Sequence, residues 1–204
     1  MAQAASDGRG TVFFDVDTQV DFMLPVGALY VPGAEHLIPA LARLAQFARS
    51  RRIPVISTAD AHAPQDPEFQ QWPPHCVAGT LGQQKVAETL SPGAVTIPNT
   101  GEELPPAWEK APQVIVEKQT LDAFRTHTLS RVLEQRRGSR FVVYGVVTEY
   151  CVLCAAQGLL SRGEQIDIVT DAIRALDSAQ GRKVLDDLQA AGARLVSVDE
   201  VLAV

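Results

Sequence analysis

The sequence contains little cysteine, with three residues in a chain of 204. An odd and small number of cysteines cannot form the disulfide framework of a fold this size, so we expect reduced thiols and a cytoplasmic protein. No apolar run approaches the roughly 20 residues that cross a bilayer, and residues 1–10 lack the apolar stretch of a signal peptide. We therefore expect no membrane association and no secretion.

Positive charge is also scarce. The formal net charge is -6, and the longest basic cluster is only Arg49-Ser50-Arg51-Arg52. Because a nucleic-acid partner needs a basic surface that neutralises phosphates, we expect no nucleic-acid binding. Hydrophobic residues make up 46% of the chain, enough to bury a substantial core, and the length fits one domain over residues 1–204.

Short apolar, β-branched runs alternate with segments of helical periodicity along most of the chain. This alternation predicts an α/β fold with a parallel sheet covered by helices on both faces. The predicted strands are 11–16, 53–58, 114–117, 141–147, 166–170 and 194–198, and the predicted helices are 36–51, 126–136, 149–161 and 178–191. Residues 60–106 show little periodicity, and an irregular stretch of that length is usually functional.

Cys151 is the strongest candidate for a nucleophile. It follows the most apolar strand and opens the next predicted helix, where the helix dipole lowers the pKa of a thiol and backbone N–H groups face a substrate oxygen. A small buried hydrophobic residue is the plain alternative. Cys154 makes a CxxC pair that could be redox-active or half of a zinc site, whereas Cys76 has no strand-to-helix turn to present it.

An acid and a lysine also stand at predicted strand ends. Asp15 and Asp17 close the first strand, where period two places them on one face, and Lys118 ends the strand 114–117. Solvation of the strand ends is the simpler explanation. In a parallel sheet, however, the carboxyl ends of neighbouring strands meet at one edge, so Asp17, Lys118 and Cys151 could converge there.

The irregular region carries a possible metal site. Asp60-Ala61-His62 follows the second strand, and His75 comes thirteen residues later. Two histidines and a carboxylate suit Zn²⁺, and Fe²⁺ or Mn²⁺ are alternatives, although a stray histidine is more often structural.

Three ordered motifs resemble the isochorismatase-like cysteine hydrolases: Asp17-Thr18-Gln19-Val20-Asp21-Phe22, Glu117-Lys118 and Gly145-Val146-Val147-Thr148-Glu149-Tyr150-Cys151. The resemblance implies a three-layer α/β/α fold with a six-stranded parallel sheet of order 3-2-1-4-5-6. It also implies a catalytic triad of Asp17, Lys118 and Cys151, and a cis peptide bond between Val146 and Val147. The backbone amides of Val147 and Cys151 would then form the oxyanion hole.

The Asp60-x-His62 pair followed by Trp72-Pro73-Pro74-His75-Cys76 resembles the nicotinamidase branch in particular. That resemblance implies a metal-containing amidohydrolase, with Zn²⁺ most expected, that deamidates nicotinamide and analogues such as pyrazinamide, and that commonly forms homo-oligomers. Many relatives have a further histidine between the two present here, so Glu68 is the candidate fourth ligand and Asp66 its rival. The aromatic residues that match the family's ring pocket are Phe22, Trp72 and Tyr150, the last standing where histidine is frequent.

Other functions fit the same residues. The thiol could act on another small amide or an N-carbamoyl compound, or a metal-bound water could be the nucleophile with Cys151 incidental. A ligand-binding relative without activity is the non-enzymatic alternative. Retention of the three triad residues and the metal ligands favours an enzyme.

Overall fold

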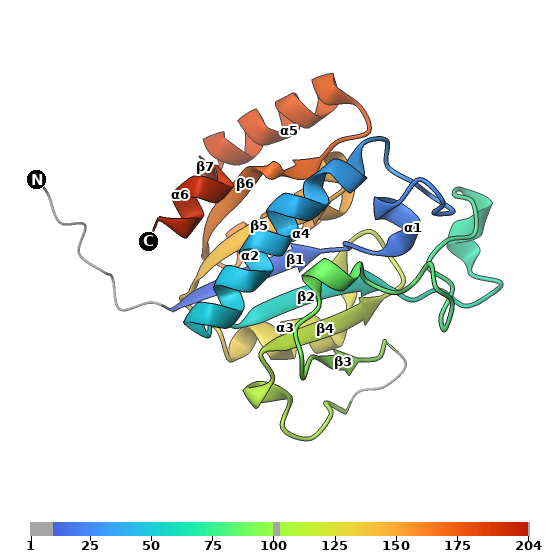
Figure 1. Ribbon diagram of the computed structural model, residues 1–204, viewed down its shortest axis with the longest axis horizontal. Coiled ribbons are helices and arrows are strands. Elements are labelled where there is room, and N and C mark those ends of the chain that lie inside the picture. The colour runs from blue at the N-terminus through green and yellow to red at the C-terminus, as the bar shows by residue number, and fades with distance from the viewer. Residues whose placement is uncertain (1–9, 100–102, 204) are drawn as a thin grey trace, which may run out of the picture.

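The computed structural model describes residues 10–99 and 103–203, and these build one seven-stranded sheet in which all strand pairs are parallel. The strand order is β3-β4-β2-β1-β5-β6-β7 (Figure 1). The strands are β1 (Thr11–Val16), β2 (Val55–Asp60), β3 (Val95–Ile97), β4 (Gln113–Lys118), β5 (Arg140–Val146), β6 (Gln165–Arg174) and β7 (Arg194–Val196). The order predicted for six strands is confirmed, and β3 adds one strand at the edge.

Helices cover both faces of the sheet and give the predicted three-layer α/β/α architecture (Figure 1). They are α1 (Val20–Met23), α2 (Ile38–Arg51), α3 (His127–Glu134), α4 (Leu153–Ser161), α5 (Ser178–Ala190) and α6 (Val198–Leu202). Helices α2 and α6 pack on one face, whereas α3, α4 and α5 pack on the other. In the part of the chain described, no helix has the length and apolar character needed to cross a membrane.

The central strand β1 shows why the sheet is buried on both sides. Phe13 joins the core under α2 and lies edge-on to Tyr144, with ring centroids 6.0 Å apart. Phe14 points to the opposite core and contacts Phe141 at 6.3 Å. Since burying each such ring contributes about 1.5–3 kcal/mol, the uninterrupted apolar run fixes β1 in the middle of the sheet.

Two local features add detail to the predicted elements. Residues 60–106 are not wholly irregular, because they contain β3 and two short 3₁₀ helices, Pro67–Gln70 and Ala87–Thr89. These elements have three or four residues each, too few to produce a periodic sequence signal. The helix expected from residue 149 begins instead as a π-helical turn, Thr148–Val152, which continues into α4. The N–H groups of Tyr150 and Val152 both donate to the carbonyl of Val147 at 3.1 Å.

Candidate active site

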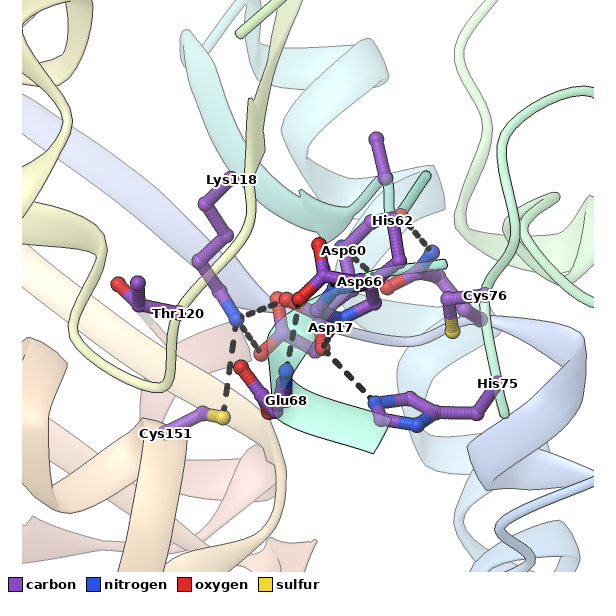
Figure 2. Close-up of polar contacts among 12 residues, drawn as sticks. Asp17, Asp60, His62, Asp66, Glu68, His75, Cys76, Lys118, Thr120 and Cys151 are labelled. Carbon is purple, nitrogen blue, oxygen red and sulfur yellow. Dashed lines mark hydrogen bonds and ion pairs between the residues drawn. The ribbon is translucent and has the colours of Figure 1, made fainter. Parts of the chain in front are cut away.

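Lys118 forms the centre of a buried charge cluster at the carboxyl ends of β1, β2, β4 and β5 (Figure 2). Its Nζ lies 2.9 Å from Asp17 Oδ2 and 3.8 Å from Cys151 Sγ, and it also donates a short hydrogen bond to Asp60 Oδ1. All four residues are buried, with Lys118 and Asp17 only 1% exposed. The structure thus brings the three residues of the expected triad together, and it adds Asp60 to the same cluster.

The end of β1 separates its two acids. Asp17 has a left-handed backbone, with φ 49°, so the alternation of the strand stops there. Asp17 Oδ1 accepts a hydrogen bond of 2.6 Å from Thr58, while Asp15 pairs with Lys85 Nζ at 3.0 Å. The expectation that Asp15 and Asp17 share one face was therefore wrong, because it assumed a strand that continues through Asp17.

The protonation of the thiol also differs from expectation. Burial raises the pKa of Cys151 well above its usual value, and the attraction of Lys118 does not offset burial together with the nearby carboxylates of Asp17 and Asp60. Burial and the two carboxylates therefore outweigh the lowering of this pKa that a helix N-terminus favours. Burial likewise raises the pKa of Asp17, against the attraction of Lys118. Burial alone would lower the pKa of Lys118, but the two carboxylates outweigh it and raise that pKa. The neutral thiol of Cys151 thus lies beside the carboxylate of Asp17, which is paired with the ammonium of Lys118. This arrangement allows the thiol proton to move to Asp17.

The peptide bond between Val146 and Val147 is cis, as the resemblance implied. Just before it, Gly145 has φ 120°, and a Cβ there would lie 2.0 Å from the carbonyl oxygen of Val16. Only glycine therefore allows β5 to approach β1 next to Asp17. The two other thiols lie elsewhere: Cys76 Sγ faces the carbonyl of Gly82 at 3.9 Å, and Cys154 is one helical turn further on, half-buried.

Asp60, His62 and His75 form a compact group of metal-ligand type. One ligand atom from each lies within 4.8 Å of the others, and all three side chains are buried (Figure 2). Both Nε2 atoms face Asp60 Oδ2 at 3.9 Å. His75 Nδ1 lies 2.8 Å from the carbonyl of Pro73, and His62 Nδ1 lies 3.1 Å from Asp66 Oδ2. The partner of His75 Nδ1 fixes that ring so that its Nε2 presents a lone pair.

A metal ion fits this group. His62 is fully buried, and among the described residues its Nε2 has no hydrogen-bond partner, an arrangement that costs free energy unless a ligand satisfies the nitrogen. Asp66 is not in the group. Its Oδ1 accepts a hydrogen bond from the N–H of Glu68 at 2.9 Å, and its Oδ2 contacts His62 Nδ1. Glu68 lies beside the three rather than among them, and lines the adjoining pocket.

The three expected aromatic residues line one hollow, open to solvent, that also reaches Asp60, His75 and Cys151. Trp72 and Tyr150 lie edge to face with centroids 5.7 Å apart, and Phe22 packs against the ring of His75 at 5.4 Å. Four further lining residues belong to no sequence motif and were not predicted: Leu29, Tyr30, Leu121 and Leu176.

Known proteins share this architecture. Residues 11–200 match the family model of the isochorismatase domain. The chain belongs to the isochorismatase domain family. It is 25% identical to the nicotinamidase of Saccharomyces cerevisiae over 214 residues, covering 86% of this chain and 94% of that protein. It is also 25% identical to the nicotinamidase of Escherichia coli over 209 residues, covering 90% and 92%.

Among solved structures, the pyrazinamidase of Pyrococcus horikoshii in complex with zinc superposes with a TM-score of 0.75 at 25% identity. The match covers 92% of this chain and 98% of that one. The resemblance to the nicotinamidase branch of the isochorismatase family is thereby confirmed, and the protein is an amidohydrolase.

Two buried polar residues of this isochorismatase domain hold the ligand-type side chains in place. Gln19 donates from Nε2 to the carbonyl of Asp60 at 2.8 Å and accepts from its N–H at 2.7 Å. Asp21 accepts from the N–H of Cys76 at 2.7 Å and so fixes the residue next to His75. Both lie in the first motif, but no spacing in the sequence reveals which loop each one contacts.

One aromatic residue near the histidines also escaped the sequence analysis. Phe69 lies beside both rings, 5.3 Å from His62 and 5.8 Å from His75 between centroids. It occupies the 3₁₀ helix Pro67–Gln70, so its contact depends on a loop path that periodicity cannot predict.

Proposed function

We propose that the protein hydrolyses nicotinamide to nicotinate and ammonia, and analogues such as pyrazinamide, through a thioester on Cys151. The observation that carries the proposal is the shared pocket, in which Cys151 lies beside Lys118 and Asp17 on one side and the group Asp60, His62 and His75 opens on the other. The similarity to two nicotinamidases supports the same substrate class.

In the first half of the reaction, Asp17 takes the proton of the Cys151 thiol, and Lys118 stabilises the charge of the resulting pair. The thiolate sulfur forms a bond to the carboxamide carbon, and the carbonyl electrons move onto oxygen. The backbone N–H groups of Val147 and Cys151 would hold that oxyanion, and loss of one such donor costs about 2.7–4 kcal/mol in other enzymes. Asp17 then returns its proton to the nitrogen as the C–N bond breaks and ammonia leaves.

In the second half, Asp17 is again a carboxylate and takes a proton from an incoming water. The hydroxide attacks the thioester carbon, the C–S bond breaks, and the proton returns to Cys151. The products are the resting thiol and nicotinic acid, which ionises to nicotinate. The raised pKa of Asp17 helps this carboxylate both to accept and to return a proton. Burial brings its pKa closer to those of the Cys151 thiol, the leaving nitrogen and water, with which it exchanges protons.

A divalent metal ion would be held by Asp60, His62 and His75, with Glu68 as the candidate fourth ligand. Zn²⁺ is the first choice for this donor set, and Fe²⁺ or Mn²⁺ also suit it. When bound, such an ion supplies a Lewis-acid contact for the ring nitrogen of a pyridine or pyrazine amide. The aromatic side chains Phe22, Trp72 and Tyr150 would then bind the faces and edge of the ring.

The charges of the pocket favour a neutral substrate. Among the described residues that line it, two are carboxylates, Asp60 and Glu68, and none is lysine or arginine. Lys118, just below the lining, is already paired with two carboxylates. An N-carbamoyl amino acid or isochorismate carries a carboxylate, and no lysine or arginine of this lining would pair with it.

The experiment is an ammonia-release assay on nicotinamide, pyrazinamide, benzamide and an N-carbamoyl amino acid, with metal supplied and with metal removed by chelation. We expect turnover of the two ring-nitrogen amides and poor use of benzamide, which has the same shape but no ring nitrogen. Chelation should abolish the preference for nicotinamide over benzamide. Preferred use of the N-carbamoyl compound would contradict the proposed substrate, and equal use of benzamide by the metal-loaded enzyme would contradict the ring contact.

A further inference from the structure

Glu149 connects the turn that carries Cys151 to a distant segment of the chain. It lies two residues before Cys151, in the π-helical turn Thr148–Val152. Its Oε1 accepts hydrogen bonds from the N–H of Leu176 at 2.9 Å and from the N–H of Asp177 at 2.8 Å. Hydrogen bonds to an ionised acceptor are roughly twice as strong as neutral ones, so this carboxylate is a firm tether for the link between β6 and α5.

The tethered segment forms the outer wall of the pocket. Leu176 lines the pocket, yet 48% of its surface is exposed, more than for most large apolar side chains among the described residues. A half-exposed leucine at the rim of an apolar pocket is placed to cover a bound ring. Its position depends on the backbone at residues 176 and 177, and both of these N–H groups are bound by Glu149.

Two further contacts limit where this wall can lie. Arg174 Nε donates to the carbonyl of Pro32 at 3.0 Å, which joins the end of β6 to the segment that carries Leu29 and Tyr30, two further lining residues. On the other side, α5 packs so closely that a Cβ on Gly181 would lie 2.6 Å from the Cβ of Ala175. Within these limits, Glu149 is the residue that couples the wall to the turn of the proposed nucleophile.

We propose that Glu149 is a positioning residue that sets the distance between Leu176 and Cys151, and thereby selects flat aromatic amides. This inference rests on the proposed function. The wall contacts the far edge of the ring and not the reacting carbonyl, so its contribution is equal in the ground state and the transition state. Loss of such binding raises KM and leaves kcat unchanged.

The test compares Glu149→Ala with Glu149→Gln in the metal-loaded enzyme. The carbonyl of glutamine still accepts both N–H groups, and Oε2 has no hydrogen-bond partner among the described residues, so replacing it removes no bond. We expect Glu149→Ala to raise KM for nicotinamide about 10-fold with little change in kcat, in the range that a lost apolar contact costs a binding pocket. Glu149→Gln should stay within about threefold of the wild type.

Leu176→Ala should raise KM as Glu149→Ala does, and the double variant should add little, because both changes remove the same wall. The matched control is Glu200→Ala, which deletes a carboxylate that likewise accepts a backbone N–H, that of Ser197 at 2.7 Å, but in α6. KM should be unchanged there. A fall in kcat at constant KM in Glu149→Ala, or fully additive effects of the two variants, would overturn the proposal.

Hydrogen exchange separates this proposal from the proposed function. In the enzyme without substrate, the amides of Leu176 and Asp177 should exchange faster in Glu149→Ala, and at the wild-type rate in Glu149→Gln and Glu200→Ala. Unchanged exchange in Glu149→Ala would overturn the tether whatever the substrate. A wild type that releases no ammonia from nicotinamide would instead contradict the proposed function, and the KM comparison would then use the amide that the panel identifies.

Discussion

Gln19 and Asp60 are joined at two points, since the Gln19 side chain donates to the Asp60 carbonyl at 2.8 Å and accepts from the Asp60 N–H at 2.7 Å. The two hydrogen bonds are like those between paired residues of neighbouring strands, except that the side-chain amide of Gln19 takes the place of one backbone. It fixes the backbone of a residue whose two carboxylate oxygens have different partners, Lys118 for Oδ1 and the two histidines for Oδ2. One glutamine thus aligns the proposed catalytic lysine with the proposed metal ligands.

Gln19→Ala should therefore weaken both stability and metal binding. The substitution leaves buried backbone groups of Asp60 unpaired, at about 1–3 kcal/mol each. Gln113→Ala is the matched control, because Gln113 is equally buried and also bonds backbone at both ends of its amide, to Thr89 and Ser91. Urea unfolding should show similar losses for the two variants, whereas titration calorimetry with Zn²⁺ should show weaker binding for Gln19→Ala alone. Equal zinc affinity in both variants would contradict the positioning role of Gln19.

The Cys151 thiol should be protonated at neutral pH. Burial raises the pKa of Cys151 well above its ordinary value of 9.0, so the thiolate appears only at higher pH. The far-ultraviolet absorbance of the thiolate, followed against pH, measures this titration directly. The signal of Cys151 is the difference between the wild type and Cys151→Ala. Cys76 and Cys154 cancel in the difference. A titration completed below pH 7 would show that the resting nucleophile is a thiolate.

Asp17→Asn should lower kcat on nicotinamide by about 10²–10⁴, the range for loss of a general acid–base group. Asp15→Asn is its control, two residues away and also in a buried ion pair, with Lys85 at 3.0 Å. The control should lose stability but keep kcat. If both variants lost kcat equally, the effect would belong to the end of β1 and not to proton transfer by Asp17.

Gly145→Ala should destabilise the protein by about 3 kcal/mol, through a left-handed backbone combined with a steric clash. A methyl group there meets the Val16 carbonyl at 2.0 Å. Gly163 also has a positive φ, 78°, but no atom lies within 4 Å of a Cβ there, so Gly163→Ala should cost only about 1 kcal/mol. Thermal or urea unfolding gives both values, and equal losses would show that the approach of β5 to β1 tolerates a side chain.

The order of the sheet was predictable because most of its strands appear in the sequence as apolar, β-branched runs. Six of the seven strands are apolar runs that appear in the sequence, and their order followed from the motif resemblance. β3 was missed because its three residues stand between Pro92-Gly93 and Pro98, whereas the equally short β7 belongs to the longer run 194–198. The π-helical turn at Cys151 was missed because it depends on two N–H groups sharing the Val147 carbonyl.

The site residues divide in the same way. Asp17, Lys118 and Cys151 could be placed from strand ends, since a parallel sheet brings these ends to one edge. The contacts of Gln19, Asp21 and Glu149 could not, because each bonds backbone of a segment remote in sequence. The pKa of Cys151 was misjudged for a related reason. Its helix position is local, but its burial beside Asp17 is a property of the whole fold.

The nucleophilic role of Cys151 is tested most directly by rapid acid quench of the enzyme during turnover of nicotinamide, followed by peptide mass spectrometry. We predict a nicotinoyl group on the peptide that contains Cys151, released by hydroxylamine and absent from Cys151→Ala, which should release no ammonia. Cys154→Ala should still form the adduct. Undiminished ammonia release by Cys151→Ala, with no adduct on any cysteine of the wild type, would contradict the thioester mechanism.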